Sequence, residues 1–182
     1  MKIYTARGDQ GATDLLGERV RKDDPRIDLL GDLDEANSSI GLGRSLATWE
    51  NANELLIAAQ RDLYQIMAEL AFIDTTRPDS LRFSADRVDW LEGSIASVQE
   101  TVTLPREFVV PGDTHAGAAL DVARTVVRRA ERSAVALAEE GAIGNPEIIR
   151  YLNRLSSLLF ILARAEDVKE RGEVRLAKGV AN

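Results

Sequence analysis

Residues 119–137 read A-L-D-V-A-R-T-V-V-R-R-A-E-R-S-A-V-A-L, and this segment combines helical apolar spacing with an unusual placement of charge. At about 100° per residue, its apolar residues form one stripe, made of Leu120, Ala123, Val127, Ala130, Ala134 and Ala138. Arg124, Arg128 and Glu131 lie along the edge of that stripe, whereas Arg129 points the other way. Amphipathic helices normally send their arginines to the solvated face. The charges beside the stripe therefore need partners or a ligand.

Two interpretations of these edge charges stay open from the helix alone. Guanidinium groups beside a core pair with carboxylates or phosphates of matching geometry. The first interpretation is an ion-pair network between packed helices. The second is an anion site, for which we expect a polyphosphate ligand.

Composition narrows the function classes. The chain has 182 residues, of which 45% are hydrophobic, and this is enough for one domain with a substantial core. Its net charge of -7 argues against non-specific nucleic-acid binding and against an anionic membrane surface. The absence of cysteine and the single histidine, His115, exclude disulfides, thiolate sites and multi-histidine metal sites. No apolar run approaches the roughly 20 residues that span a bilayer, so we expect a soluble cytoplasmic protein.

The N-terminal residues 5–26 form a polar segment punctuated by glycines, T-A-R-G-D-Q-G-A-T-D-L-L-G-E-R-V-R-K-D-D-P-R. Glycines permit close backbone approach, and the hydroxyls of Thr5 and Thr13 with nearby backbone N–H groups are suited to phosphate oxygens. Its positive charges are Arg7, Arg19, Arg21 and Lys22. No G-K-[ST] follows the glycines, so it is not a Walker A motif. An ordinary surface loop is the alternative interpretation.

Helical spacing recurs through the rest of the chain. The expected helices begin near Ile27, cover 51–73 and 84–98, continue through the arginine segment to about Gly141, and end with 146–171. Ser84 and Asn145 are the predicted N-caps of the third and last helices, and Trp90 is interpreted as a packing residue. With no convincing strand pattern, the sequence predicts a single-domain, all-α, five-helix up-and-down bundle. Residues 1–26 precede the bundle (27–171), and 172–182 form a polar tail that we expect to be poorly ordered.

Two further positions invite a functional interpretation. On the first helix, Leu30, Leu33, Asp34, Asn37, Ile40 and Gly41 share a face. A carboxylate among core positions needs a cation, and Arg124 is the natural partner of Asp34. Phe108 lies in the connector 101–113, whose prolines and glycine break helices. This ring is either core filler or a platform facing a ligand.

The motifs together resemble those of the PduO-type ATP:cob(I)alamin adenosyltransferases. They are I-Y-T-A-R-G-D-Q-G-A-T-D-L-L-G, R-V-R-K-D-D-P-R, G-D-L-D-E-A-N-S-S-I-G, F-V-V-P-G, A-R-T-V-V-R-R-A-E-R and Y-L-N-R-L-S, in the same order from Ile3 to about Arg164. The resemblance implies a homotrimer of five-helix bundles with active sites between subunits. It also implies transfer of the 5′-deoxyadenosyl group of ATP to cobalt, with release of triphosphate.

The resemblance also assigns residues. For ATP it implies Thr5, Ala6, Arg7, Gly8, Thr13, Asp14, Lys22, Arg128, Arg129, Glu131, Arg132 and Asn153. For catalysis it implies Arg128, Glu131, Phe108, Asp34 and Arg124. Phe108 resembles the aromatic residue on the lower face of the corrin, and Asp34 with Arg124 resembles an ion pair between subunits. Cobalamin is then a substrate, and Mg²⁺ is expected on the ATP phosphates near Glu131, with no metal site evident from the sequence itself.

Three positions depart from the family's usual pattern. Ser157 stands where the last motif usually has an acid, Asp113 where the connector usually has a second glycine, and Leu30 where an aromatic residue is common. The first change bears on hydrogen bonding near Asn153, the second on the corrin-facing loop, and the third on packing. None alters Arg128.

Other functions remain to be weighed against this one. A non-catalytic trimer that senses a nucleotide, or that escorts adenosylcobalamin to a client enzyme, would retain the same loop and arginines. A ferritin-like metal bundle is disfavoured, because the sequence contains no Glu-x-x-His pair. An adenosyltransferase would also need a reductase partner, which the sequence does not identify.

Overall fold

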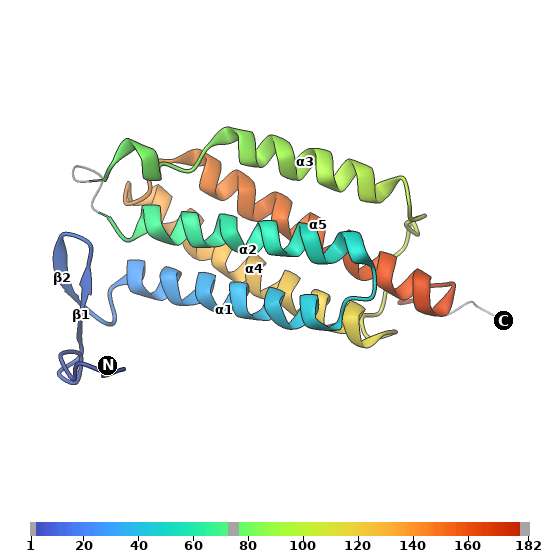
Figure 1. Cartoon of the computed structure of the whole chain (residues 1–182), viewed down its shortest axis with the longest axis horizontal. Coiled ribbons are helices and arrows are strands. Elements are labelled where there is room, and N and C mark those ends of the chain that lie inside the picture. The colour runs from blue at the N-terminus through green and yellow to red at the C-terminus, as the bar shows by residue number, and fades with distance from the viewer. Residues whose placement is uncertain (1–2, 73–76, 179–182) are drawn as a thin grey trace.

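The computed structural model describes residues 3–72 and 77–178. Within them, five helices run alternately up and down one long axis (Figure 1). They are α1 (Pro25–Leu46), α2 (Glu50–Leu70), α3 (Ala85–Gln99), α4 (His115–Glu139) and α5 (Pro146–Arg171), with a short 3-10 turn, η1 (Asp79–Leu81), before α3. The predicted five-helix bundle is confirmed. The expected end of the second helix, Ile73, lies outside the described residues.

Local capping chemistry sets the helix ends. The Ser84 side chain accepts from Asp86 N–H, and the Asn145 side chain accepts from Glu147 N–H, so both predicted N-caps are confirmed. Asp24 caps α1 in the same way, so that helix begins at Pro25, two residues before the predicted start at Ile27. Gly172 ends α5 with φ +79, a left-handed conformation that favours glycine.

Helix α4 packs along both α1 and α5, and these contacts form most of the core. The predicted stripe of α4 is buried from Leu120 to Ala134, and its alanines let the neighbouring helices approach. At Gly43 of α1 the approach is closest, because an added Cβ would lie 2.8 Å from Leu120 Cδ2. The mainly small residues of the stripe therefore position α4, and with it the edge charges.

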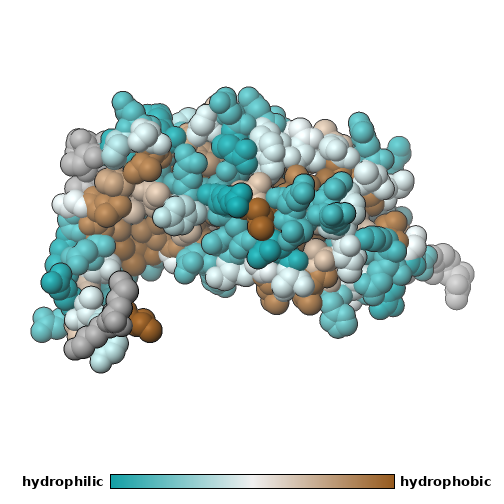
Figure 2. Space-filling model, viewed as in Figure 1, coloured by the Kyte–Doolittle hydropathy of each residue, from teal (hydrophilic) through white to brown (hydrophobic). Residues whose placement is uncertain are grey.

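A two-stranded hairpin stands where the sequence indicated only a loop. Strand β1 (Ala12–Leu15) pairs antiparallel with β2 (Glu18–Arg21), and Gly17 turns between them with φ +118. The hairpin extends beyond one end of the bundle (Figure 1), attached there by Leu16 N–H donating to the Ala71 carbonyl at 2.9 Å. Figure 2 shows hydrophobic surface between the hairpin and that end of the bundle. The prediction of no strand was wrong, because four-residue strands give too short an alternation to recognise.

The buried face of α1 includes Leu33 and Ile40 of the predicted face, but its centre is rotated from the predicted one by about 80°. Leu29, Leu33, Ala36, Ile40 and Gly43 are the buried positions. The carboxylate at position 34 is exposed. Asp34 lies on the side from which the buried face has turned away, so its placement among core positions was wrong.

The start of the C-terminal tail is ordered, contrary to expectation. Val110 N–H donates to the Arg175 carbonyl at 2.8 Å, and Ala177 N–H donates to the Phe108 carbonyl at 2.7 Å. Asp113 accepts from Arg175 N–H at 2.8 Å. The tail thus pairs with the connector that carries Phe108, while residues 179–182 lie outside the described part of the chain.

Candidate active site

The groove between α4 and α5 contains the cation that the sequence singled out. Arg128 is exposed there, on the wall of a hollow of about 380 Å³ that it shares with Arg124, Ser157 and Phe160. Among residues 3–72 and 77–178, no carboxylate pairs with its guanidinium. The ion-pair interpretation therefore does not account for Arg128, and an anionic ligand can reach it.

The neighbouring Arg129 behaves differently. It forms ion pairs with Asp32 and Glu35 of α1, and the hydrogen bonds that it donates to Glu35 first and to Asp32 second raise its pKa. Arg129 is exposed, as its position opposite the stripe predicts, but α1 brings two carboxylates to it that the helix alone did not indicate. Its place in the expected ATP set is weakened, since carboxylates already satisfy its charge.

Glu131 and Asn153 face each other across α4 and α5. Asn153 Nδ2 donates to Glu131 Oε1 at 2.7 Å, and Asn153 Oδ1 accepts from Arg154 Nη1 at 2.8 Å. Arg132 Nη1 donates to the backbone carbonyl of Arg128 at 2.9 Å. These polar groups extend the groove along the helices from Arg128.

Phe108 is 88% exposed, so the core-filler interpretation was wrong. Its ring lies on the rim of a second hollow of about 400 Å³, whose lining includes Arg124, Phe160 and Arg164. Arg124 and Phe160 line both hollows. The aromatic ring and the unpaired arginine therefore belong to one continuous surface.

Arg124 forms an ion pair with a residue of its own helix, α4. Its Nε donates to Asp121 Oδ1 at 2.9 Å, and its side chain is 25% exposed. Asp34 lies exposed on α1 and makes no ion pair with Arg124 within one chain. The partner assigned from burial was therefore wrong inside the chain, while a pair between two chains stays a prediction.

The N-terminal loop brings its phosphate-binding candidates together. The Lys22 ε-ammonium lies over Gly8, where an added Cβ would be 3.1 Å from its Nζ. Gly8 thus makes room for the lysine. Arg19 donates to Asp14 Oδ1 at 2.8 Å and to the Arg7 carbonyl at 2.7 Å. Asp14 therefore serves this loop as an ion-pair partner.

The backbone of the same loop has left-handed turns around these side chains. Ala6 has φ +60 and Gly11 has φ +79, conformations that expose successive N–H groups. Thr5 Oγ1 accepts from Arg7 N–H at 3.4 Å, and Thr13 is half-buried in β1. Ala6 and Thr5 are thus placed for backbone and hydroxyl contacts, whereas Thr13 is partly enclosed by the hairpin.

The loop and Phe108 lie at opposite ends of the bundle. In Figure 1 the hairpin extends from one end, while the α3–α4 connector and the C-terminus are at the other. The 22 residues of α1 separate these ends by about 33 Å at 1.5 Å per residue. A single chain cannot place its own loop beside its own Phe108.

Sequence reasoning missed several buried charges. Asp121, Arg164 and Asp167 are almost fully buried and joined by ion pairs, and Asp62 accepts from Arg87 and Tyr151 between α2, α3 and α5. Burial and the Asp62 carboxylate raise the pKa of Tyr151. Arg164 and Asp167 are only three residues apart on α5, but the partners Asp121 and Asp62 lie on other helices, so the sequence gives no local signal for those pairs.

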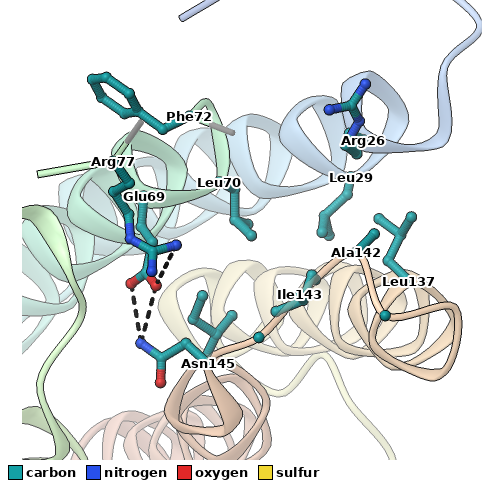
Figure 3. Close-up of a pocket in the computed structure, with 13 residues that line it drawn as sticks. Arg26, Leu29, Glu69, Leu70, Phe72, Arg77, Leu137, Ala142, Ile143 and Asn145 are labelled. Atoms are coloured by element: carbon teal, nitrogen blue, oxygen red, sulfur yellow. Dashed lines mark hydrogen bonds and ion pairs between the residues drawn. The ribbon is translucent and has the colours of Figure 1, made fainter. Parts of the chain in front are cut away.

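Another pocket of about 280 Å³ lies at the hairpin end of the bundle, and none of the expected site residues lines it (Figure 3). Glu69 accepts from Asn145 Nδ2 at 3.1 Å and from Phe83 N–H at 2.5 Å, and Arg77 lies 3.5 Å from it. The other lining residues are largely apolar, including Leu70. Its polar groups satisfy one another, so we assign this pocket to packing.

The family model for cobalamin adenosyltransferases matches residues 3–166. The chain belongs to this family. The family predicted from the motifs is therefore confirmed.

Curated relatives agree with this assignment. The corrinoid adenosyltransferase PduO of Salmonella typhimurium is 41% identical over 92% of this chain and 50% of its own length. The corrinoid adenosyltransferase of Bacillus subtilis is 35% identical over 93% of this chain and 88% of its own. The chain thus spans about half the length of the PduO relatives.

Solved structures share the fold. A variant PduO-type ATP:corrinoid adenosyltransferase from Lactobacillus reuteri, complexed with cobalamin and ATP, has a TM-score of 0.90 at 34% identity, covering 98% of this chain and 100% of that one. A second variant of the same enzyme, complexed with ATP, has a TM-score of 0.83 at 34% identity, covering 97% of this chain and 100% of that one. Within the part of this family member that the structure describes, no helix is long and apolar enough to cross a membrane.

The three departures from the family pattern have distinct surroundings. Ser157 is exposed beside Arg128, so it leaves that arginine without the acid expected nearby. Asp113 holds the tail through Arg175, and Leu30 is half-buried on α1. The first two changes therefore lie next to the candidate surface, and the third concerns packing.

Proposed function

We propose that this protein transfers the 5′-deoxyadenosyl group of ATP to cob(I)alamin, forming adenosylcobalamin and releasing triphosphate. The observation that carries the proposal is the surface on which an unpaired, exposed Arg128 continues through Arg124 to an exposed Phe108. A free cation suits the polyphosphate, and an exposed aromatic ring suits the face of a large apolar macrocycle.

The separation of the N-terminal loop from the Phe108 surface supports an active site that is shared between chains. The loop with Lys22 and the surface with Phe108 lie about 33 Å apart in one chain, from the length of α1. We propose a homotrimer in which the loop of each chain reaches the α4–α5 groove of its neighbour. A cyclic arrangement of this kind uses two different patches per chain and closes into a ring. Asp34 and Arg124 are proposed to pair across the same interface.

The protein's contribution to the reaction is alignment and electrostatics. The cobalt electron pair attacks C5′ of ATP and forms the Co–C bond, while the C5′–O bond breaks and its electrons leave with triphosphate. No side chain needs to be deprotonated. Arg128 and Lys22 are placed to neutralise the charge that develops on the leaving group.

Mg²⁺ is assigned to the nucleotide. Among the residues that the structure describes, no three acidic or histidine side chains gather closely enough to hold a metal ion. Glu131 is a single carboxylate bonded to Asn153, so we propose that Mg²⁺ arrives on the ATP phosphates near it. When bound there, it supplies further neutralisation of phosphate charge.

Phe108 is proposed to occupy the lower face of the corrin. An apolar ring at that place excludes water and other axial donors, which makes cobalt easier to reduce to the nucleophilic state. The exposure of Phe108 and the pairing of its backbone with the tail support this role. A reductase, a client enzyme and a cytoplasmic setting belong to the same proposal.

The decisive experiment is an anaerobic assay of the purified protein with chemically reduced cobalamin and ATP. Formation of the Co–C bond changes the corrin spectrum, and triphosphate should appear in equal amount. A protein that only senses nucleotide or escorts adenosylcobalamin would bind ligand without turnover. Absence of both signals would reject the enzymatic function.

A further inference from the structure

A buried ion network lies beneath the surface that joins Phe108 to Arg128. Asp121 uses both carboxylate oxygens, because Oδ1 accepts from Arg124 Nε at 2.9 Å and Oδ2 accepts from Arg164 Nη2 at 2.6 Å. The side chains of Asp121 and Arg164 are 4% and 1% exposed. Asp121 thus bridges one arginine of the core and one arginine of the surface.

The buried Arg164 has a second acidic partner besides Asp121. Arg164 also pairs with Asp167 at 2.8 Å, and Asp167 accepts from the hydroxyl of Thr114 at 2.8 Å. Thr114 is the N-cap of α4, directly after the Phe108 connector. Two acids face two arginines, so the network balances its charges, as burial requires.

On the surface side of the network, Arg124 keeps hydrogen-bond donors that are not used. Only its Nε is bonded within the described residues, and the Nη groups have no partner there. A guanidinium is planar and presents its donors in a fixed fork. The bond from Nε to a buried carboxylate therefore restricts where the remaining donors can point, and Arg124 lines both hollows of the candidate surface.

We propose that Asp121 is a positioning residue, which holds the Arg124 guanidinium ready for a carboxylate of the neighbouring chain. This inference rests on the proposed trimer and its Asp34–Arg124 pair. Without Asp121, Arg124 would sample several rotamers and lose side-chain entropy when the neighbour binds. Asp121 lines the hollow beside Phe108 but is almost fully buried beneath the two arginines, so its proposed role is exerted through Arg124.

The test compares Asp121→Asn with Asp167→Asn. Both substitutions keep the side-chain shape, remove one buried negative charge and contact the same Arg164, but only the first contacts Arg124. Each leaves Arg164 one intact acid, so both variants should fold with similar melting temperatures. We expect Asp121→Asn to raise the protein concentration at half-assembly about tenfold in sedimentation equilibrium, and Asp167→Asn to raise it less than about twofold, since one oriented charge-assisted bond is at stake only in the first.

A double variant separates positioning from general packing. In an Asp34→Ala background, Asp121→Asn should add nothing, because the partner of Arg124 is already gone. Kinetics on the same proteins should show a higher KM for cobalamin in Asp121→Asn, with kcat at saturation changed less. Equal losses in Asp121→Asn and Asp167→Asn, or an undiminished effect in the Asp34→Ala background, would overturn the inference.

The outcome is independent of the reaction assignment. A wild-type trimer that forms no Co–C bond would reject the proposed reaction while the assembly comparison still decides the role of Asp121. An active wild-type trimer with indistinguishable Asp121→Asn and Asp167→Asn variants would reject only the role of Asp121. A monomeric wild-type protein would overturn it together with the Asp34–Arg124 pair.

Discussion

Replacing Arg128 by alanine tests the phosphate-binding surface most directly. Arg128 is exposed and has no carboxylate partner in the described structure, so its loss should change the free energy of unfolding by no more than about 0.5 kcal/mol. Loss of a donor placed at a developing charge costs about 2.7 to 4 kcal/mol, which is roughly 100-fold to 1,000-fold in rate. We therefore expect kcat/KM for ATP to fall by this factor while the melting temperature stays constant.

The adjacent Arg129 provides a matched control. It lies on the same helix and is also exposed, but Asp32 and Glu35 pair with it. Arg129→Ala should therefore lower stability slightly, as expected for exposed ion pairs, and leave kcat/KM within a few fold of the unmodified protein. Measurements by anaerobic spectroscopy on both variants give the comparison. Near-normal turnover of Arg128→Ala, or equal losses in the two variants, would refute the assignment of Arg128 to the phosphates.

Three further substitutions extend this logic. Phe108→Ala should change the free energy of unfolding by no more than about 0.5 kcal/mol, because the ring is 88% exposed. The same change should remove the signal of four-coordinate cob(II)alamin in electron paramagnetic resonance. An unchanged spectrum would show that Phe108 does not occupy the corrin face. Asp34→Ala should weaken the trimer in sedimentation by about 3 to 5 kcal/mol, the usual cost of breaking a buried pair from one side, and an unaffected trimer would exclude the pair. The guanidinium of Arg26 lowers the pKa of Asp24 below its ordinary value of 3.8, so the stability from this cap is present above pH 3.8 and is lost as pH falls through the folded-state pKa. The free energy of unfolding in urea should accordingly depend less steeply on pH below that value for Asp24→Asn than for the unmodified protein. Parallel pH profiles of the two proteins would contradict this.

The parts of the fold that depend on local chemistry were predictable from the sequence. Ser84 and Asn145 cap helices by bonding to N–H groups two residues ahead, and such contacts need no knowledge of the rest of the chain. The buried stripe of α4 follows in the same way from the spacing of Leu120, Ala123 and Val127. Hydrophobic period and capping residues together were sufficient for the five helices.

The parts that depend on distant partners were not predictable. Arg129 looked solvated from its own helix, yet α1 brings Asp32 and Glu35 to it. Phe108 looked like core filler because phenylalanine is usually buried, but the connector holds it outside, paired through its backbone with a tail that composition alone marked as disordered. A sequence shows which groups need partners, while only the packed structure shows which groups supply them.

The separation of the two half-sites leads to one last prediction, which concerns complementation. If each site takes its loop from one chain and its groove from the next, Lys22→Ala and Arg128→Ala damage different halves. Each variant alone should have little activity, but every mixed trimer should regain about one third of the wild-type sites, since a 2:1 or 1:2 ring contains one place where an undamaged loop meets an undamaged groove. Co-expression with two affinity tags, followed by sequential purification, isolates the mixed trimers for the anaerobic assay. The melting temperatures of the parent variants serve as the control, because both side chains are exposed. If mixing restores no activity in verified mixed trimers, one chain must join its own Lys22 to its own Arg128, and the proposed sharing of sites between neighbours fails.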